Sequence, residues 1–152
     1  MKLKISGFLL LFIVFASACT QQAAMTTTTI TSSIRKEINF VTDDSVKIYG
    51  TYWDRGTEKK LILLHMLGRD RNIWNNFAEN SGYTVIAIDL RGHGESDGDW
   101  QSFQEGDFNK MVLDVKGARE FLGGGDIVII GASIGANVAL NYADNYGADG
   151  VI

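Results

Sequence analysis

The sequence contains a single cysteine, two histidines and no proline. One cysteine cannot form an internal disulfide, which excludes a domain stabilised by disulfides. Zinc and similar metals are held by several cysteine, histidine and carboxylate side chains, and the two histidines lie in separate loops. We therefore expect no metal site and no cofactor. The absence of proline excludes nothing.

Positive charge is also scarce, with 14 lysines and arginines against 18 aspartates and glutamates and a formal net charge of −4. Proteins that bind nucleic acid are usually basic, because they neutralise phosphates. The chain shows no internal repeats, and its length allows one small domain. We therefore expect no nucleic-acid partner, and a small molecule is the better candidate for a ligand.

The N-terminus has the three parts of an export signal. Met1–Lys4 is basic, and residues 5–18 are almost wholly apolar. This run of about 14 residues is short for a membrane span, which takes about 20, and is typical of a signal-peptide core. Ala16-Ser17-Ala18 is a small-residue cleavage site. We predict that residues 1–18 are a signal peptide; the alternative is a buried core helix.

The only cysteine, Cys19, follows the cleavage site directly. Its position resembles the lipobox of bacterial-type lipoproteins, with Ala16 where that motif usually has leucine. Lipidation of Cys19 would tether the protein to a membrane of the cell envelope; ordinary cleavage, which releases a secreted protein, is the alternative. The polar, threonine-rich stretch over residues 19–33 predicts a linker.

Residues 34–152 alternate strand and helix patterns. Apolar residues at consecutive positions indicate strands covered on both faces, and apolar residues three or four apart indicate helices. The expected elements are a hairpin (34–41 and 46–53), strands at 60–65, 83–88, 126–130 and 150–152, and helices after Asp70, over 107–122 and from Ser133 to about 146. This order predicts an α/β fold with a mostly parallel sheet, an antiparallel N-terminal hairpin and helices on both faces.

Three loops leave the carboxyl ends of the predicted parallel strands. They hold residues 65–68, residues 89–96 and Ser133. Active groups in such sheets gather at these ends, so we expect the three loops to meet at one cleft.

Ser133 stands in the pentapeptide Gly131-Ala132-Ser133-Ile134-Gly135, between an apolar strand and a helix-forming stretch. A turn this tight needs glycine at both flanking positions, because side chains there would collide. The serine hydroxyl is then held clear of the backbone at a helix N-terminus, which favours negative charge. This is the nucleophile-elbow pattern, although the five residues alone are a weak signal in a chain with 17 glycines.

Four motifs in order make residues 34–152 resemble the α/β-hydrolase superfamily. The hairpin comes first, and residues 63–68 (LLHMLG) resemble the histidine-glycine loop after the third strand. Residues 88–96 (IDLRGHGES) are similar to the loop after the fourth strand in the serine aminopeptidase-like and dienelactone-hydrolase-like branches. Residues 131–135 match the elbow.

The resemblance implies a serine hydrolase that acts on an ester or related acyl bond. Ser133 would be the nucleophile and would form an acyl-enzyme. The backbone N–H of Ile134 would be one oxyanion donor, and that of Leu67 the other. Met66 stands where the family often has glycine.

The catalytic acid and base of the family follow the serine, yet no histidine follows Ser133 here. We expect His93 to shape its loop and His65 to hydrogen-bond locally, since a base has to reach the nucleophile. The chain is therefore expected to be the N-terminal part of a longer hydrolase and inactive by itself. One alternative is a non-catalytic, membrane-anchored binding protein. Another is a dinucleotide binder, in which Ser133 would replace the central glycine of Gly-x-Gly-x-x-Ala.

Overall fold

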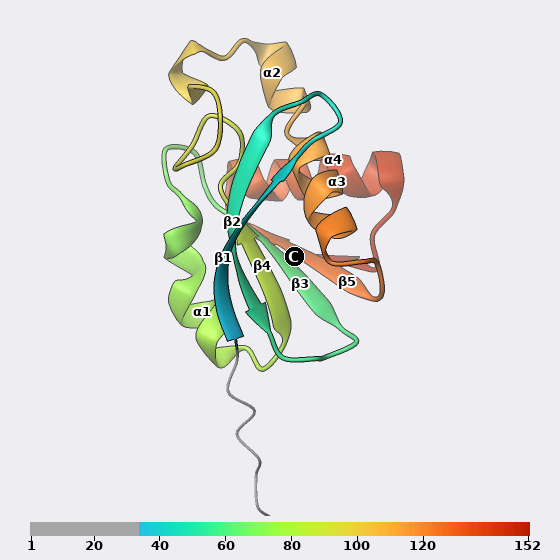
Figure 1. Ribbon diagram of the computed structural model, residues 1–152. Coiled ribbons are helices and arrows are strands. Elements are labelled where there is room, and N and C mark those ends of the chain that lie inside the picture. The colour runs from blue at the N-terminus through green and yellow to red at the C-terminus, as the bar shows by residue number, and fades with distance from the viewer. Residues whose placement is uncertain (1–33) are drawn as a thin grey trace, which may run out of the picture. The chain divides into compact units, whose positions relative to one another are not determined.

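The computed structural model describes residues 34–152; the predicted signal peptide (1–18) and linker (19–33) lie outside these residues. Within the described range, six strands form one sheet in the order β1-β2-β4-β3-β5-β6 (Figure 1). The strands are β1 (Ile34–Val41), β2 (Lys47–Asp54), β3 (Lys60–Leu64), β4 (Thr84–Ile88), β5 (Ile127–Gly131) and β6 (Gly150–Val151). The β1–β2 and β2–β4 pairs are antiparallel, and the β4–β3, β3–β5 and β5–β6 pairs are parallel. The predicted fold class and N-terminal hairpin are confirmed.

Helices cover both faces of the sheet (Figure 1). The helical elements are η1 (Arg71–Trp74), α1 (Asn75–Asn80), η2 (Trp100–Ser102), α2 (Glu105–Asn109), α3 (Val112–Phe121) and α4 (Ile134–Tyr146). The helix expected after Asp70 begins as the 3-10 turn η1, and the Asp70 side chain accepts a hydrogen bond from the Asn72 N–H. On its apolar side Ala78 is buried and Trp74 packs against the core, whereas Ile73 and Phe77 stay about 40% and 42% exposed.

Alternate residues of the central strands point to opposite faces of the sheet and pack into two separate cores. This explains why the sequence has apolar residues at consecutive positions in these strands. Ile62 and Leu64 of β3 pack with residues of α3 and α4. Leu61 and Leu63 of the same strand pack on the other face, with Ala78 of α1. All five residues of β4 are buried. The loop that follows β4 therefore starts from a strand in the middle of the core.

The single helix expected over residues 107–122 is wrong in one respect, because two helices occupy this stretch. α2 ends at Asn109 and α3 begins at Val112. At Lys110 and Met111 the backbone ψ angles are −14° and −18°, tighter than in an α-helix. The turn places Met111 fully in the core and starts α3, which carries the buried Asp114.

Candidate active site

Ser133 lies at the turn between β5 and α4, with a backbone φ of 54° and ψ of −113°. A positive φ is rare for a residue with a side chain, and such strain costs about 1–3 kcal/mol. The residue is exposed to solvent. An exposed, strained serine on a strand-to-helix turn has the geometry of a nucleophile elbow.

Contacts of the backbone explain the two flanking glycines. A Cβ on Gly131 would lie 2.3 Å from the carbonyl carbon of Gly135. A Cβ on Gly135 would lie 2.6 Å from the carbonyl oxygen of Leu64 and 2.8 Å from that of His65. The predicted need for glycine at both positions is confirmed. The second contact also shows that the elbow packs directly against the end of β3.

The predicted oxyanion donors are the backbone N–H groups of Ile134, in the elbow, and of Leu67, in the loop after β3. The N–H of Ala132 donates to the Leu64 carbonyl at 3.0 Å, which joins the elbow to β3. Ile134 is the first residue of α4, and the first N–H groups of a helix have no partner within it. Leu67 is 42% exposed and lies in a turn closed by a 3.2 Å hydrogen bond from the Arg69 N–H to the Met66 carbonyl. Their shared role as oxyanion donors stays a prediction.

Both histidines of the sequence are buried and hold loops. His65 is fully buried: its Nδ1 lies 2.8 Å from the Met66 carbonyl oxygen, and its Nε2 accepts a 3.0 Å hydrogen bond from the Leu90 N–H. His93 is 4% exposed, with Nδ1 3.1 Å from the Arg91 carbonyl oxygen and its ring stacked on Trp100. These contacts are those expected of local, loop-shaping histidines.

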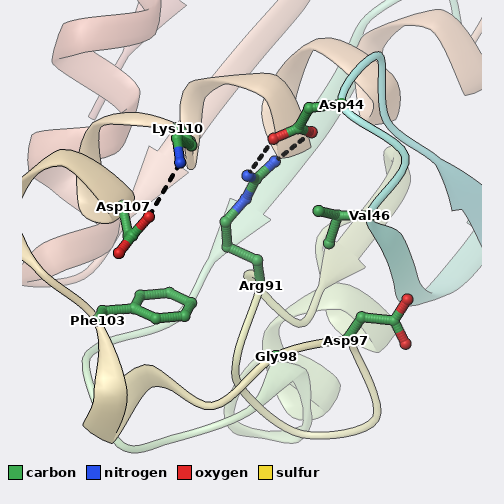
Figure 2. Close-up of a pocket in the computed structure, with 8 residues that line it drawn as sticks. All are labelled: Asp44, Val46, Arg91, Asp97, Gly98, Phe103, Asp107 and Lys110. Carbon is green, nitrogen blue, oxygen red and sulfur yellow. Dashed lines mark hydrogen bonds and ion pairs between the residues drawn. The ribbon is translucent and has the colours of Figure 1, made fainter.

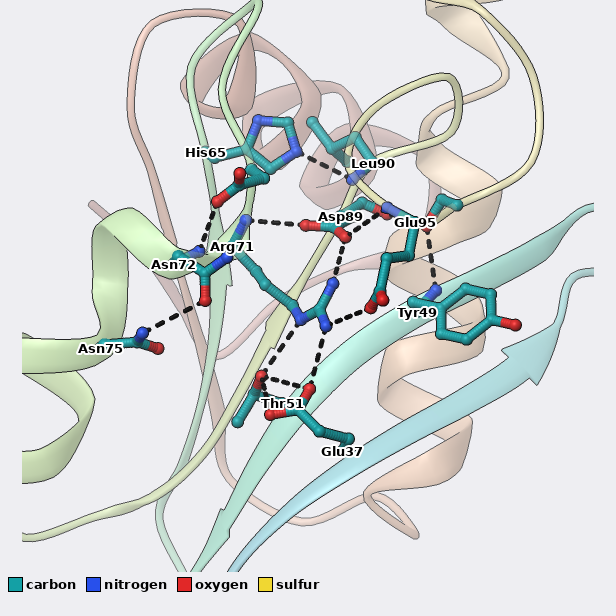
Figure 3. Close-up of polar contacts among 12 residues, drawn as sticks. Glu37, Tyr49, Thr51, His65, Arg71, Asn72, Asn75, Asp89, Leu90 and Glu95 are labelled. Carbon is teal, nitrogen blue, oxygen red and sulfur yellow. Dashed lines mark hydrogen bonds and ion pairs between the residues drawn. The ribbon is translucent and has the colours of Figure 1, made fainter.

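Asp89, at the end of β4, organises the loop that follows (Figure 3). Its buried carboxylate accepts hydrogen bonds from the backbone N–H groups of Arg71 (2.7 Å) and Glu95 (2.9 Å) and pairs with the Arg71 guanidinium. Arg71 also contacts Thr51 and Glu37 on the hairpin. Asp89 thus joins the loop after β4 to Arg71 and shapes it.

A second ionic group is centred on Arg91 in the same loop (Figure 2). Its guanidinium binds Asp114 of α3 and Asp44 of the β1–β2 turn, and its backbone N–H also donates to Asp114 at 2.9 Å. Burial raises the pKa of Asp114 to about 6, and the hydrogen bond and positive charge of Arg91 oppose this shift. The hydrogen bond from Arg91 lowers the pKa of Asp44 to about 2. Arg91, paired with these two carboxylates, forms part of the wall of an adjoining cavity of 330 Å³.

Sequence reasoning missed Arg71, Asp114 and Asp44. Each pairs with a residue 18 to 47 positions away. No local motif links such residues, so only the folded chain reveals them.

Among residues 34–152, no group of three or more histidine, cysteine, aspartate or glutamate side chains is placed to hold a metal ion. No helix in that range is both long and apolar enough to cross a bilayer. Cys19, the predicted lipidation site, lies outside the described residues.

Residues 59–151 match the family model for the alpha/beta hydrolase fold, and the chain belongs to this family. A curated relative is a 2-hydroxy-6-oxononadienedioate/2-hydroxy-6-oxononatrienedioate hydrolase from Burkholderia vietnamiensis, 34% identical over 122 residues. That match covers 76% of this chain and 41% of the relative, so the chain spans about two fifths of its length.

Solved structures show the same fold. An esterase from Pyrococcus furiosus is 31% identical, with a TM-score of 0.66, and the match covers 76% of this chain and 47% of the esterase. A bottromycin epimerase solved with bottromycin A2 is 27% identical, with a TM-score of 0.63 over 72% of this chain and 44% of the epimerase. The fold therefore carries more than one activity among proteins similar to this chain.

Proposed function

We propose that the full-length protein is an exported serine hydrolase that cleaves an ester or related acyl bond through an acyl-enzyme on Ser133. The observation that carries this proposal is that Ser133 is exposed and has a strained backbone. It lies between Gly131 and Gly135, two positions where a side chain would not fit. Strain of this kind persists where the surrounding structure enforces it, and it is concentrated at functional sites. Relatives named as an esterase and as a hydrolase support the reaction type.

The proposed reaction begins when Ser133 Oγ attacks the acyl carbon while a base takes its proton. The N–H groups of Ile134 and Leu67 would stabilise the oxyanion, and each such donor is worth about 3 kcal/mol in the transition state. The leaving group departs with the proton, and water then hydrolyses the acyl-enzyme by the same route.

The base in the proposed reaction is a group other than the two histidines of this sequence. Neither histidine of this sequence offers an exposed nitrogen, because His65 and His93 are buried and hold their own loops. A serine without a base is a weak nucleophile. The 152-residue chain alone is therefore proposed to be inactive.

The proposed substrate is a small acyl compound, with no metal, cofactor or nucleic acid required. The Burkholderia relative is named for the hydrolysis of a dienedioate, so such a compound belongs in the substrate panel beside simple esters. In this fold the substrate is selected by variable loops. The Burkholderia relative is more than twice as long as the stretch that matches this chain, so most of its length lies outside the match.

Hydrolysis of a panel of p-nitrophenyl esters by the full-length protein tests the proposal. Ser133→Ala should lower kcat by at least about 10³-fold, because it removes the nucleophile. Ser102→Ala is the matched control, since Ser102 is an exposed serine on η2, and it should retain wild-type activity. Equal rates for wild type and Ser133→Ala would contradict the proposal.

A second candidate is a non-catalytic, membrane-anchored binding protein with a hydrolase-like sheet. His65 and His93 are both buried and so are not placed to act as a base, which favours this second candidate for the chain taken alone. It predicts that calorimetry detects saturable binding of a small molecule. It also predicts that neither the wild type nor Ser133→Ala turns over a substrate.

Anchoring through Cys19 is proposed separately from the chemistry. Metabolic labelling with an alkyne fatty acid in a bacterial host should mark the wild-type protein and not Cys19→Ser. A wild-type protein that is exported without label would contradict lipidation and favour ordinary cleavage and secretion.

A further inference from the structure

His65 connects the loop after β3 to the loop after β4. One ring nitrogen contacts the Met66 carbonyl oxygen, and the other contacts the Leu90 N–H (Figure 3 shows the second contact). The side chain is fully buried, so water does not compete for either bond. Both ends of the ring are thus committed to backbone groups of two different loops.

The contact with Leu90 determines the protonation of the ring. A backbone N–H can only donate, so Nε2 of His65 has to accept and carries no proton. The neutral ring then bears its proton on Nδ1, which donates to the Met66 carbonyl oxygen at 2.8 Å. His65 is therefore neutral and in the Nδ1–H tautomer.

The Met66 carbonyl is the other half of the peptide unit that contains the Leu67 N–H. Peptide units are planar, and those among residues 34–152 are trans, so the two groups point in opposite directions. Fixing the Met66 oxygen therefore fixes the direction of the Leu67 N–H. The Arg69 N–H holds the same oxygen less tightly, at 3.2 Å.

We propose that His65 is a positioning residue, which aims the Leu67 N–H at the oxyanion by holding the Met66 carbonyl. This inference rests on the proposed function, because it gives Leu67 its role as an oxyanion donor. His65 itself touches neither the substrate nor the nucleophile.

The surroundings of His65 favour the neutral ring. Burial lowers its pKa, an effect partly opposed by the hydrogen bond to Met66. The charged or titratable groups that act on it are His93, whose ring centre is 4.9 Å away, and the carboxylates of Asp89 and Asp70. The ring thus has its single proton available for the Met66 bond at neutral pH.

Two amide variants separate the two ends of the ring. The terminal amide of Gln reaches the place of Nε2, so His65→Gln keeps the bond to Leu90 and loses that to Met66. The shorter Asn places its amide at Nδ1, so His65→Asn keeps the bond to Met66 and loses that to Leu90. A purely structural role predicts that both variants are destabilised without a specific change in kcat.

Steady-state kinetics of the full-length protein should show kcat of His65→Gln lowered 10- to 100-fold, with KM changed less than threefold, because small misplacements of a catalytic donor are costly. His65→Asn should keep kcat within threefold of wild type. His93→Asn is the control from the same buried ring pair and should also stay within threefold. Wild-type kcat in His65→Gln, or equal losses in both His65 variants, would overturn the proposal.

The tautomer provides a test that needs no variant. Imidazole ¹⁵N shifts at neutral pH should show a proton on Nδ1 of His65 and none on Nε2; the Nε2–H tautomer or a protonated ring would overturn the proposal. Failure of the proposed function has a different signature, in which Ser133→Ala keeps wild-type activity. That result would remove the oxyanion role, and with it the inference, while leaving the tautomer as described.

Discussion

The elbow and the two loops after β3 and β4 lie at the same edge of the sheet, but different forces hold them. The elbow is shaped by steric contact: its glycines approach backbone atoms so closely that a methyl group would not fit. The two loops are shaped by buried polar bonds, centred on His65, Asp89 and Arg91. The elbow should therefore respond to side-chain volume, and the loops to the loss of a donor, an acceptor or a charge.

The largest effect is expected where a buried charge of the loops is removed. Asp89→Asn leaves the Arg71 guanidinium without its buried partner and turns one acceptor into a donor. We expect a loss of about 4 kcal/mol in the free energy of unfolding, measured by urea denaturation. Asp126→Asn is the control, since its carboxylate pairs with Lys59 at the surface, and it should change little. A loss no larger than in the control would show that the Asp89 cluster does not hold the loop.

A smaller loss is expected when volume is added to the elbow. In Gly135→Ala the new methyl group would meet the carbonyl oxygens of Leu64 and His65, which are backbone atoms held in the fold. We expect about 3 kcal/mol of destabilisation by the same measurement. Gly106→Ala, in α2 with no atom near its Cβ, should instead be neutral or slightly stabilising. Equal stability of the two variants would contradict a sterically built elbow.

Releasing the strain at Ser133 should stabilise the protein. Ser133→Gly removes the Cβ at a φ of 54° and should raise the free energy of unfolding by about 1 kcal/mol while activity is lost. Ser133→Ala keeps the Cβ and hence the strain, so it should lose activity without the gain. If Ser133→Gly is no more stable than Ser133→Ala, the backbone stores no strain.

The smallest effect is expected at the partly exposed end of the Arg91 cluster, and it depends on pH. Because Arg91 lowers the pKa of Asp44 to about 2, this pair stabilises the fold above the ordinary carboxyl pKa. The contribution is lost as the pH falls from about 4 to 2. The Tm of Asp44→Asn should thus lie slightly below wild type at pH 7 and equal it near pH 2. A difference in Tm that persists at pH 2 would assign the effect to something other than this charge.

Features encoded in neighbouring residues were predictable from the sequence. The apolar runs of β3 and β4, the helix start at Asp70 and the glycines around Ser133 all act within a few positions, and the structure confirms them. The turn at Lys110 and Met111 was missed, because the apolar spacing of a helix continues across it.

The polar framework of the site could not be predicted in the same way. Arg71 pairs with Asp89 and Arg91 with Asp114 across strands and helices that only the fold brings together. The bridging role of His65 depends on the Leu90 N–H, 25 positions away. Sequence reasoning thus found the nucleophile candidate, whereas the groups that hold its surroundings required the structure.

Ser133 as the nucleophile is tested most directly by covalent trapping. The full-length protein is treated with a fluorophosphonate, digested, and its peptides are mapped by mass spectrometry. We predict a single adduct on Ser133, absent from Ser133→Ala and unchanged in Ser102→Ala. An adduct on another residue, or equal labelling of wild type and Ser133→Ala, would contradict the assignment of this elbow as the catalytic site.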